Sequence, residues 1–253
     1  MNRKYEKQKK GFTKVPKYIW NAMQGLAYWI GYKKRLYQYY SLSESAIVTE
    51  FCSLLQAGLN NNEIVLCERQ YRNFFNKVPK ELKRCRMDVT VAEISEQSLI
   101  TKKDLISNEN KKKDAFLKEI AKVVFEVKLL DSPKSLKEID FESLKKVKDN
   151  NGDVVTYFLL VSEDKIPCKF VNTTTGIALD DSQLDYDRNK YKLHVSKVKC
   201  VLDSKIRTDS MKKIIKDFLG SSGNIEKKIN EQLDKYMKRH FSKGVFVCLI
   251  EVV

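Results

Sequence analysis

The sequence predicts an α/β protein with a mixed central β-sheet flanked by helices, and three observations carry this prediction. Residues 123–130 are β-branched and mostly apolar, and 154–161 is a continuous apolar run, which is typical of a strand buried on both faces. A helical pattern over 141–149 lies between them, so residues 119–162 indicate a βαβ crossover with parallel strands. Residues 84–94 alternate apolar and polar side chains, as a further strand does.

The first 40 residues are basic and aromatic, with Lys33, Lys34 and Arg35 set among tyrosines. One interpretation is contact with nucleic acid, whose phosphates bind cations and whose bases stack on rings. A second is an amphipathic helix that packs its aromatic side chains on the core or on a second subunit, and a third is an interfacial membrane helix. Asn21 and Gln24 interrupt the apolar stretch 18–32, which is too short to span a bilayer, so we expect no signal peptide and no transmembrane helix.

A helix is predicted over residues 43–58. Ser41 or Ser43 can cap it, and Glu44 in its first turn suits the helix dipole. Its apolar side chains recur at helical spacing and form one stripe. Strands are then expected over 63–75, 84–94 and 122–130, with a basic turn at 76–83 and a charged insertion at 95–118.

The C-terminal part begins after a turn at 150–152. Asp140 is expected to cap the helix at 141–149. Residues 166–202 suggest short strands around an acidic, solvated loop at 180–187, followed by helices at 207–219 and 224–240 and a final strand at 244–253. We therefore divide the chain into a basic aromatic segment (1–40), a core (41–162) and a C-terminal region that completes or extends the core (163–253).

Two charged residues interrupt the apolar strand at 122–130, where charge is costly. Glu126 and Lys128 are two residues apart and so point to the same face of a strand. Asp88 on a neighbouring strand would lie opposite Glu126. Two carboxylates beside a lysine make a site for Mg²⁺, which prefers oxygen ligands. The alternative is an ion pair on an edge strand that faces solvent.

A metal held by Asp88, Glu126 and the carbonyl of Val127 would polarise a phosphate and lower the pKa of a bound water. Lys128 would position that water or help to deprotonate it. The net charge of +15 also favours a polyanionic partner such as nucleic acid. This chemistry needs neither histidine nor cysteine; the six cysteines form no C-x-x-C pair and are interpreted as core residues in a reducing cytoplasm.

The chain resembles the PD-(D/E)XK, or restriction-endonuclease-like, nucleases over roughly residues 41–162. The runs RMDVTV at 86–91 and VFEVKL at 124–129 are similar to the signature (P)D…(D/E)-x-K, with Met87 in place of proline and a long gap between the two motifs. The resemblance implies an acidic residue on the preceding helix that completes the metal site: Glu44, or Glu50 as the alternative. Glu68 on the first strand is a further candidate.

The resemblance also implies an activity and a setting. We expect a Mg²⁺-dependent endonuclease acting on DNA, with Mn²⁺ able to substitute, in restriction or defence against phage. Because no glutamine follows Lys128, the endonuclease is favoured over an exonuclease. Lys145 and Lys146 would contact the nucleic-acid backbone. We also expect a homodimer or a partner protein of a defence system. The protein is expected in the cytoplasm, without membrane association. The alternative is a non-catalytic nucleic-acid-binding subunit with a nuclease-like fold.

Overall fold

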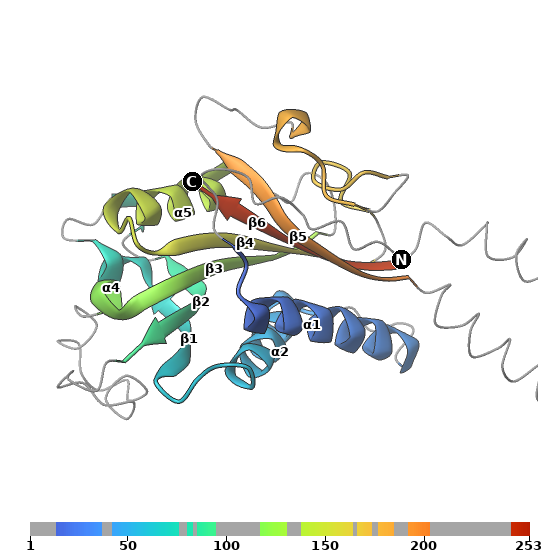
Figure 1. The fold of residues 1–253 in the computed structure, drawn as a ribbon, viewed down its shortest axis with the longest axis horizontal. Helices are drawn as coiled ribbons and strands as arrows, with labels where there is room; N and C mark the ends of the chain where they lie inside the picture. The colour runs from blue at the N-terminus through green and yellow to red at the C-terminus, as the bar shows by residue number, and fades with distance from the viewer. Residues whose placement is uncertain are drawn as a thin grey trace, which may run out of the picture.

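A computed structural model describes most of the predicted core. The described residues are 14–36, 42–75, 80–82, 85–94, 117–130, 138–163, 166–173, 177–184, 192–202 and 244–253. They form a six-stranded mixed sheet in the order β1-β2-β3-β4-β6-β5, with helices on both faces (Figure 1). The strands are β1 (Glu63–Gln70), β2 (Arg86–Glu93), β3 (Ala121–Leu129), β4 (Val155–Ser162), β5 (Leu193–Leu202) and β6 (Gly244–Val252). The predicted α/β class with a mixed sheet is thus confirmed.

The β3–β4 pair is parallel, and the other strand pairs are antiparallel. Helix α5 (Glu138–Asn150) connects the parallel pair, as the predicted βαβ crossover requires. Strand β6 comes last in the chain and lies between β4 and β5. Residues far apart in sequence therefore make up the centre of the sheet, and β4 is buried along most of its length, as its apolar run predicts.

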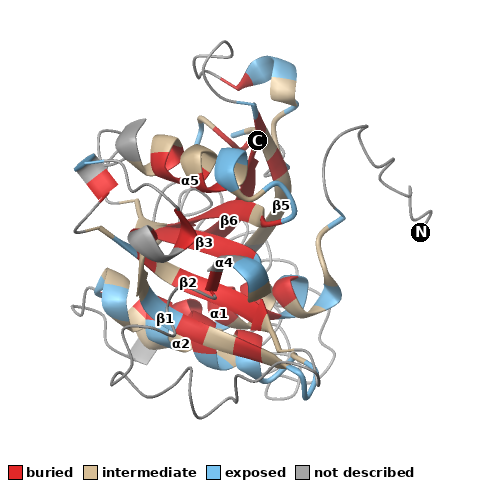
Figure 2. Cartoon of the chain, turned by 90° about the vertical axis from the view of Figure 1, so that its left-hand side faces the viewer, coloured by how far each residue is buried: buried red, intermediate tan, exposed pale blue. Residues whose placement is uncertain are grey.

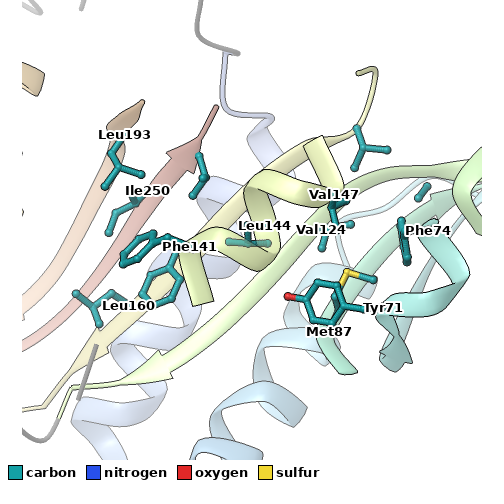
Figure 3. Close-up of a cluster of buried hydrophobic side chains, with 14 of the residues drawn as sticks. Tyr71, Phe74, Met87, Val124, Phe141, Leu144, Val147, Leu160, Leu193 and Ile250 are labelled. Carbon is teal, nitrogen blue, oxygen red and sulfur yellow. The ribbon is translucent and has the colours of Figure 1, made fainter. Parts of the chain in front are cut away.

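Each face of the sheet carries its own apolar core. Helices α1 (Lys17–Leu36) and α2 (Glu44–Gln56) cover one face, and α5 covers the other (Figures 1 and 2). Alternation along β3 supplies both cores, because Phe125 joins the first and Val124 joins the second. Figure 3 shows the core beneath α5, where Phe141 of the helix stacks on Phe158 of β4 with ring centroids 4.6 Å apart.

Helix α1 accounts for much of the basic aromatic segment. Its buried stripe is aliphatic and includes Ile19, Met23 and Leu26, whereas Trp20 and Tyr28 are among its exposed side chains. The described part of the segment is therefore a packed amphipathic helix, in which Tyr18 and Trp29 pack partly against the core while Trp20 and Tyr28 are exposed. No helix in the described part of the chain is long and apolar enough to cross a membrane.

Helix α2 begins where the sequence predicts. The hydroxyl of Ser43 accepts a hydrogen bond from the N–H of Ala46 at 3.2 Å, and the backbone of Ser43 is extended, as an N-cap requires. Its core-facing residues include Ile47, Phe51 and Leu55. The cap and the stripe together place Glu44 in the first turn of the helix, at the end that faces the site described below.

The strand expected over 63–75 is too long. Strand β1 ends at Gln70 and a 3₁₀ turn, η1 (Tyr71–Phe74), follows it. Glu68 has φ 50°, a left-handed conformation that is uncommon for a residue with a side chain and distorts the end of the strand. The turn brings Tyr71 and Phe74 into the core beside Met87 (Figure 3).

Other differences lie in connecting segments. A short helix, α4 (Leu117–Ile120), occupies the end of the predicted insertion, and η2 (Lys80–Leu82) lies before β2. Within 166–184 the described residues form only an isolated bridge between Val171 and Ala178 and the 3₁₀ helix η4 (Asp181–Gln183), instead of short strands. The helices predicted at 207–219 and 224–240 fall outside the described residues.

Candidate active site

Strands β2 and β3 part at the predicted cluster. Their last paired residues are Val89 and Phe125, and beyond this point the N–H groups of β3 that faced β2 need other acceptors. The carboxylate of Asp88 accepts the N–H of Val127 at 2.6 Å, and that of Glu44 accepts the N–H of Leu129 at 3.3 Å. The side chains of Asp88 in β2 and Glu44 in α2 thus accept the hydrogen bonds that the backbone of β2 no longer accepts.

Lys128 lies among these carboxylates. Its Nζ is 3.1 Å from Oε1 of Glu126 and 3.3 Å from Oε1 of Glu44. Glu126 is only 7% exposed, and β3 lies between β2 and β4. The alternative of a solvent-facing pair on an edge strand is therefore wrong. Three elements, α2, β2 and β3, bring four charged side chains together at this place. We call these residues the carboxylate cluster: Glu44, Asp88, Glu126 and Lys128.

Two further residues adjoin the carboxylate cluster, and the sequence analysis did not assign either to it. The hydroxyl of Tyr71, buried in η1, donates to Oε2 of Glu126 at 3.2 Å. Asp140 lies in the first turn of α5, inside the helix rather than at its cap, and its charge raises the pKa of both Asp88 and Glu126. An acid in the first turn after an E-x-K strand was the available signal for Asp140.

The carboxylate cluster has more negative charge than Lys128 can balance. Burial, reinforced by Asp88, raises the pKa of Glu126 to about 8, although Lys128 pulls it down. Burial likewise raises the pKa of Asp88 to about 6 against the effects of the Val127 N–H and Lys128. Burial opposes the charged form of Lys128 as well, but Glu126 and Glu44 outweigh it and hold the pKa of Lys128 above its ordinary value.

The structure separates the candidate helix acids. Glu44 contacts Lys128, whereas Glu50 is six residues further along α2, which turns its side chain by about 240° around the helix axis. Glu50 makes no described hydrogen bond or ion pair with the carboxylate cluster. Glu68 is exposed and pairs with Arg86 at 3.0 Å, so it does not point into the cluster.

The predicted nucleic-acid contacts lie on two helices. Lys33 is on α1, with its Nζ 5.7 Å from the centroid of the Trp29 ring, while the side chains of Lys34 and Arg35 lie outside the described part. On α5, Lys145 pairs with Asp149 at 3.7 Å and Lys146 with Glu142 at 3.2 Å, one turn away in each case. Partly exposed i,i+4 pairs of this kind each contribute little to stability.

The donors of the carboxylate cluster suit a hard divalent cation. Carboxylate oxygens are the ligands that Mg²⁺ prefers, and because burial raises the pKa values of Asp88 and Glu126, a cation beside them would favour their charged forms. Among the described residues no three His, Cys, Asp or Glu side chains lie together in a group that could hold one metal ion. Mg²⁺ does not require three, since it is commonly bound through one or two carboxylates, water and substrate phosphate.

Comparison of the chain with protein-family models, with curated proteins and with solved structures gave no match. Function is therefore argued from the site itself.

Proposed function

We propose that this protein is a metal-dependent phosphodiesterase, a nuclease acting on DNA, with a restriction-endonuclease-like core. The observation that carries the proposal is the carboxylate cluster at the parting of β2 and β3, where a buried Glu126 with a pKa of about 8 and a half-buried Asp88 face one lysine. Buried carboxylates cost stability unless they are paired or hold a cation. That two such carboxylates lie beside the C-terminal half of β3 favours a functional role.

Asp88, Glu126 and the carbonyl of Val127 are the groups that would hold Mg²⁺ or Mn²⁺. In an extended strand the N–H and C=O of one residue point to the same side, so the Val127 carbonyl faces the side on which Asp88 lies. When bound, the ion supplies charge to polarise a scissile phosphate and to lower the pKa of a water. Tyr71 holds Glu126 in place through its hydroxyl.

Lys128 is the residue that would act on the attacking water and on the phosphate. Its ammonium is charged at neutral pH, because its carboxylate neighbours favour the charged form. It would orient the water and offset charge that develops on the phosphoryl oxygens. Glu44 keeps the ammonium in position from α2 and, through its second oxygen, binds the backbone at Leu129.

The net charge of +15 supports a polyanionic substrate. Binding through phosphates weakens steeply with salt, so DNA binding by this protein should fall by orders of magnitude between about 50 and 200 mM salt. A setting in restriction or phage defence rests on the resemblance to PD-(D/E)XK nucleases and stays a prediction, as do a homodimer and a partner protein.

The test is cleavage of supercoiled plasmid in Mg²⁺, Mn²⁺ or EDTA by the wild type, Glu126→Gln and Lys128→Ala. Lys122→Ala and Glu93→Gln are matched controls, because Lys122 and Glu93 form an exposed ion pair between β3 and β2, 3.1 Å apart. We expect metal-dependent cleavage by the wild type and both controls, and a loss of about 100-fold or more in both cluster variants.

Cleavage that persists in Glu126→Gln and Lys128→Ala would refute the proposal. Metal-independent binding of DNA without cleavage by the wild type would favour the alternative, a non-catalytic nucleic-acid-binding subunit. One observation agrees with that alternative: Asp88 and Glu44 already serve the fold by accepting the N–H groups of Val127 and Leu129.

A further inference from the structure

Two cysteines lie in contact on the face of the sheet covered by α2. Cys52 is in α2 and is buried, and Cys67 is in β1 and is exposed. Their Sγ atoms are 3.0 Å apart, within hydrogen-bonding distance. The prediction that the cysteines are core residues holds for Cys52 and is wrong for the exposed Cys67. A disulfide bond is about 2.05 Å long, so closure needs a relative movement of about 1 Å.

The surroundings of the two thiols shift their pKa values in opposite directions. The hydrogen bond between Cys67 and Cys52 lowers the pKa of Cys67 to about 7, with a smaller contribution from Arg69, while burial and Glu68 oppose the shift. The same contact raises the pKa of Cys52, which therefore keeps its proton. The exposed Cys67 sulfur therefore ionises near neutral pH, and its thiolate is the reactive form, whereas the buried Cys52 sulfur stays protonated.

We propose that Cys67 is a hydroperoxide-reactive thiol and that Cys52 resolves it into a disulfide that ties α2 to β1. The Cys67 thiolate attacks one oxygen of the hydroperoxide, the O–O bond breaks, and the other oxygen leaves as an alcohol or water after taking a proton. Cys67 becomes a sulfenic acid. The sulfur of Cys52 then attacks that of Cys67, the S–OH bond breaks, and the hydroxide leaves as water with the Cys52 proton. The two sulfurs are oxidised and the peroxide is reduced.

This modification site is independent of the proposed nuclease activity. The bond would join residues 15 positions apart, across the turn that separates α2 from β1. A crosslink over such a loop restricts the unfolded chain and stabilises the fold, so oxidation should raise the melting temperature. Because α2 also carries Glu44, the disulfide would hold the helix that reaches the carboxylate cluster.

The experiment treats the full-length protein with hydrogen peroxide at pH 7, quenches it with N-ethylmaleimide and maps the thiols by mass spectrometry. Trypsin leaves both cysteines on one peptide, because no lysine or arginine lies between Arg35 and Arg69. A glutamyl endopeptidase that cuts after Glu63 separates them. Exposed Cys168 is the internal reference, and Cys168→Ser is the matched control for Cys52→Ser and Cys67→Ser.

We expect a 52–67 disulfide that forms about threefold or more faster than Cys168 is oxidised, with a rise in melting temperature that dithiothreitol reverses. In Cys52→Ser, Cys67 should accumulate as sulfenic and sulfinic acid, and Cys168→Ser should behave like the wild type. Oxidation of Cys67 no faster than that of Cys168, or sulfinic acid at Cys67 in the wild type in place of the disulfide, would overturn the proposal. The wild-type measurement decides the matter even if a serine variant fails to fold.

Discussion

The two halves of β3 differ in composition and in partners, because Glu126 and Lys128 both lie in the second half. From Val123 to Phe125 the strand is paired with β2 on one side and β4 on the other, and its side chains fill both cores. From Glu126 to Leu129 it keeps β4 but loses β2, and carboxylates take the vacated positions. The first half stabilises the sheet. The second half accumulates charge that the sheet must tolerate.

The comparison teaches how a strand can be made into a site. Buried backbone N–H groups need acceptors, so where two strands part, side-chain oxygens can accept the hydrogen bonds that the neighbouring strand no longer accepts. Asp88 is supplied in this way, and burial raises the pKa of both Asp88 and Glu126, with smaller contributions from the repulsion of neighbouring carboxylates. Binding a cation relieves that repulsion.

The largest effect is expected in the paired half. Phe125→Ala removes a ring that packs against Phe51 and Tyr157, with centroids 5.2 and 5.6 Å away, and should cost about 3–5 kcal/mol of unfolding free energy. Urea denaturation measures the loss. Ile177→Ala, at a large apolar side chain that is 63% exposed, is the control and should change stability by less than about 0.5 kcal/mol. Equal losses at the two positions would contradict the role of Phe125 in the core.

The next effect concerns the unpaired half and depends on pH. Because the pKa of Glu126 is about 8 in the folded protein and near 4.5 ordinarily, the unfolded chain releases this proton first as pH rises. Folding stability should therefore fall between pH 4.5 and 8. Glu126→Gln does not titrate, so it should be more stable than the wild type at pH 8, by on the order of 2 kcal/mol, and lose that advantage near pH 5.

Urea midpoints at pH 5, 6.5 and 8 measure this pH dependence. Glu93→Gln is the matched control, since Glu93 is exposed in its pair with Lys122 and should keep the wild-type slope. If Glu126→Gln showed the same pH slope as the wild type, the repulsion ascribed to the carboxylate cluster would be wrong.

A smaller effect is expected at Tyr71. Tyr71→Phe keeps the ring in the core and removes the hydroxyl that donates to Glu126, for a loss of about 1 kcal/mol. Tyr157→Phe is a stringent control: that hydroxyl is buried with no hydrogen-bond partner among the described residues, so its removal should cost nothing or stabilise the fold. Chemical denaturation at pH 7 compares the two, and a larger loss in Tyr157→Phe would contradict the account.

The smallest effect is at the cap of α2. Ser43→Ala deletes the acceptor for the Ala46 N–H and should cost about 0.5–1 kcal/mol, with some fraying of the turn that carries Glu44. Ser53→Ala tests the same helix at an exposed interior position, where alanine is the better helix former. The cap explanation fails if the two substitutions have the same effect on stability.

Much of the paired half could be predicted from sequence, because its signals are local. The β-branched run at β3, the capped stripe of α2 and the βαβ order each lie within one stretch of chain. Glu126 and Lys128 stood out because charge in such a strand is costly. Of the two helix acids that the resemblance implies, Glu44 is the one that contacts Lys128.

The rest could not be predicted because it depends on contacts between distant residues. Asp88 reaches Val127 only because β2 and β3 pair and then part, across a long insertion whose placement no local pattern determines. Tyr71 was assigned to a strand that continued to residue 75. The strand ends at Gln70 and a 3₁₀ turn begins at Tyr71, and no local pattern in the sequence marks that boundary.

The most direct test of the central claim is calorimetric titration of the protein with Mn²⁺ at pH 7 in two buffers of different ionisation enthalpy. If the carboxylate cluster exchanges a proton for a cation, the wild type should bind Mn²⁺ and release on the order of one proton, because Glu126 is largely protonated at that pH. Glu126→Gln should lose both the binding and the release. A wild type that binds no cation, or a Glu126→Gln variant that binds it with the same proton release, would contradict the account.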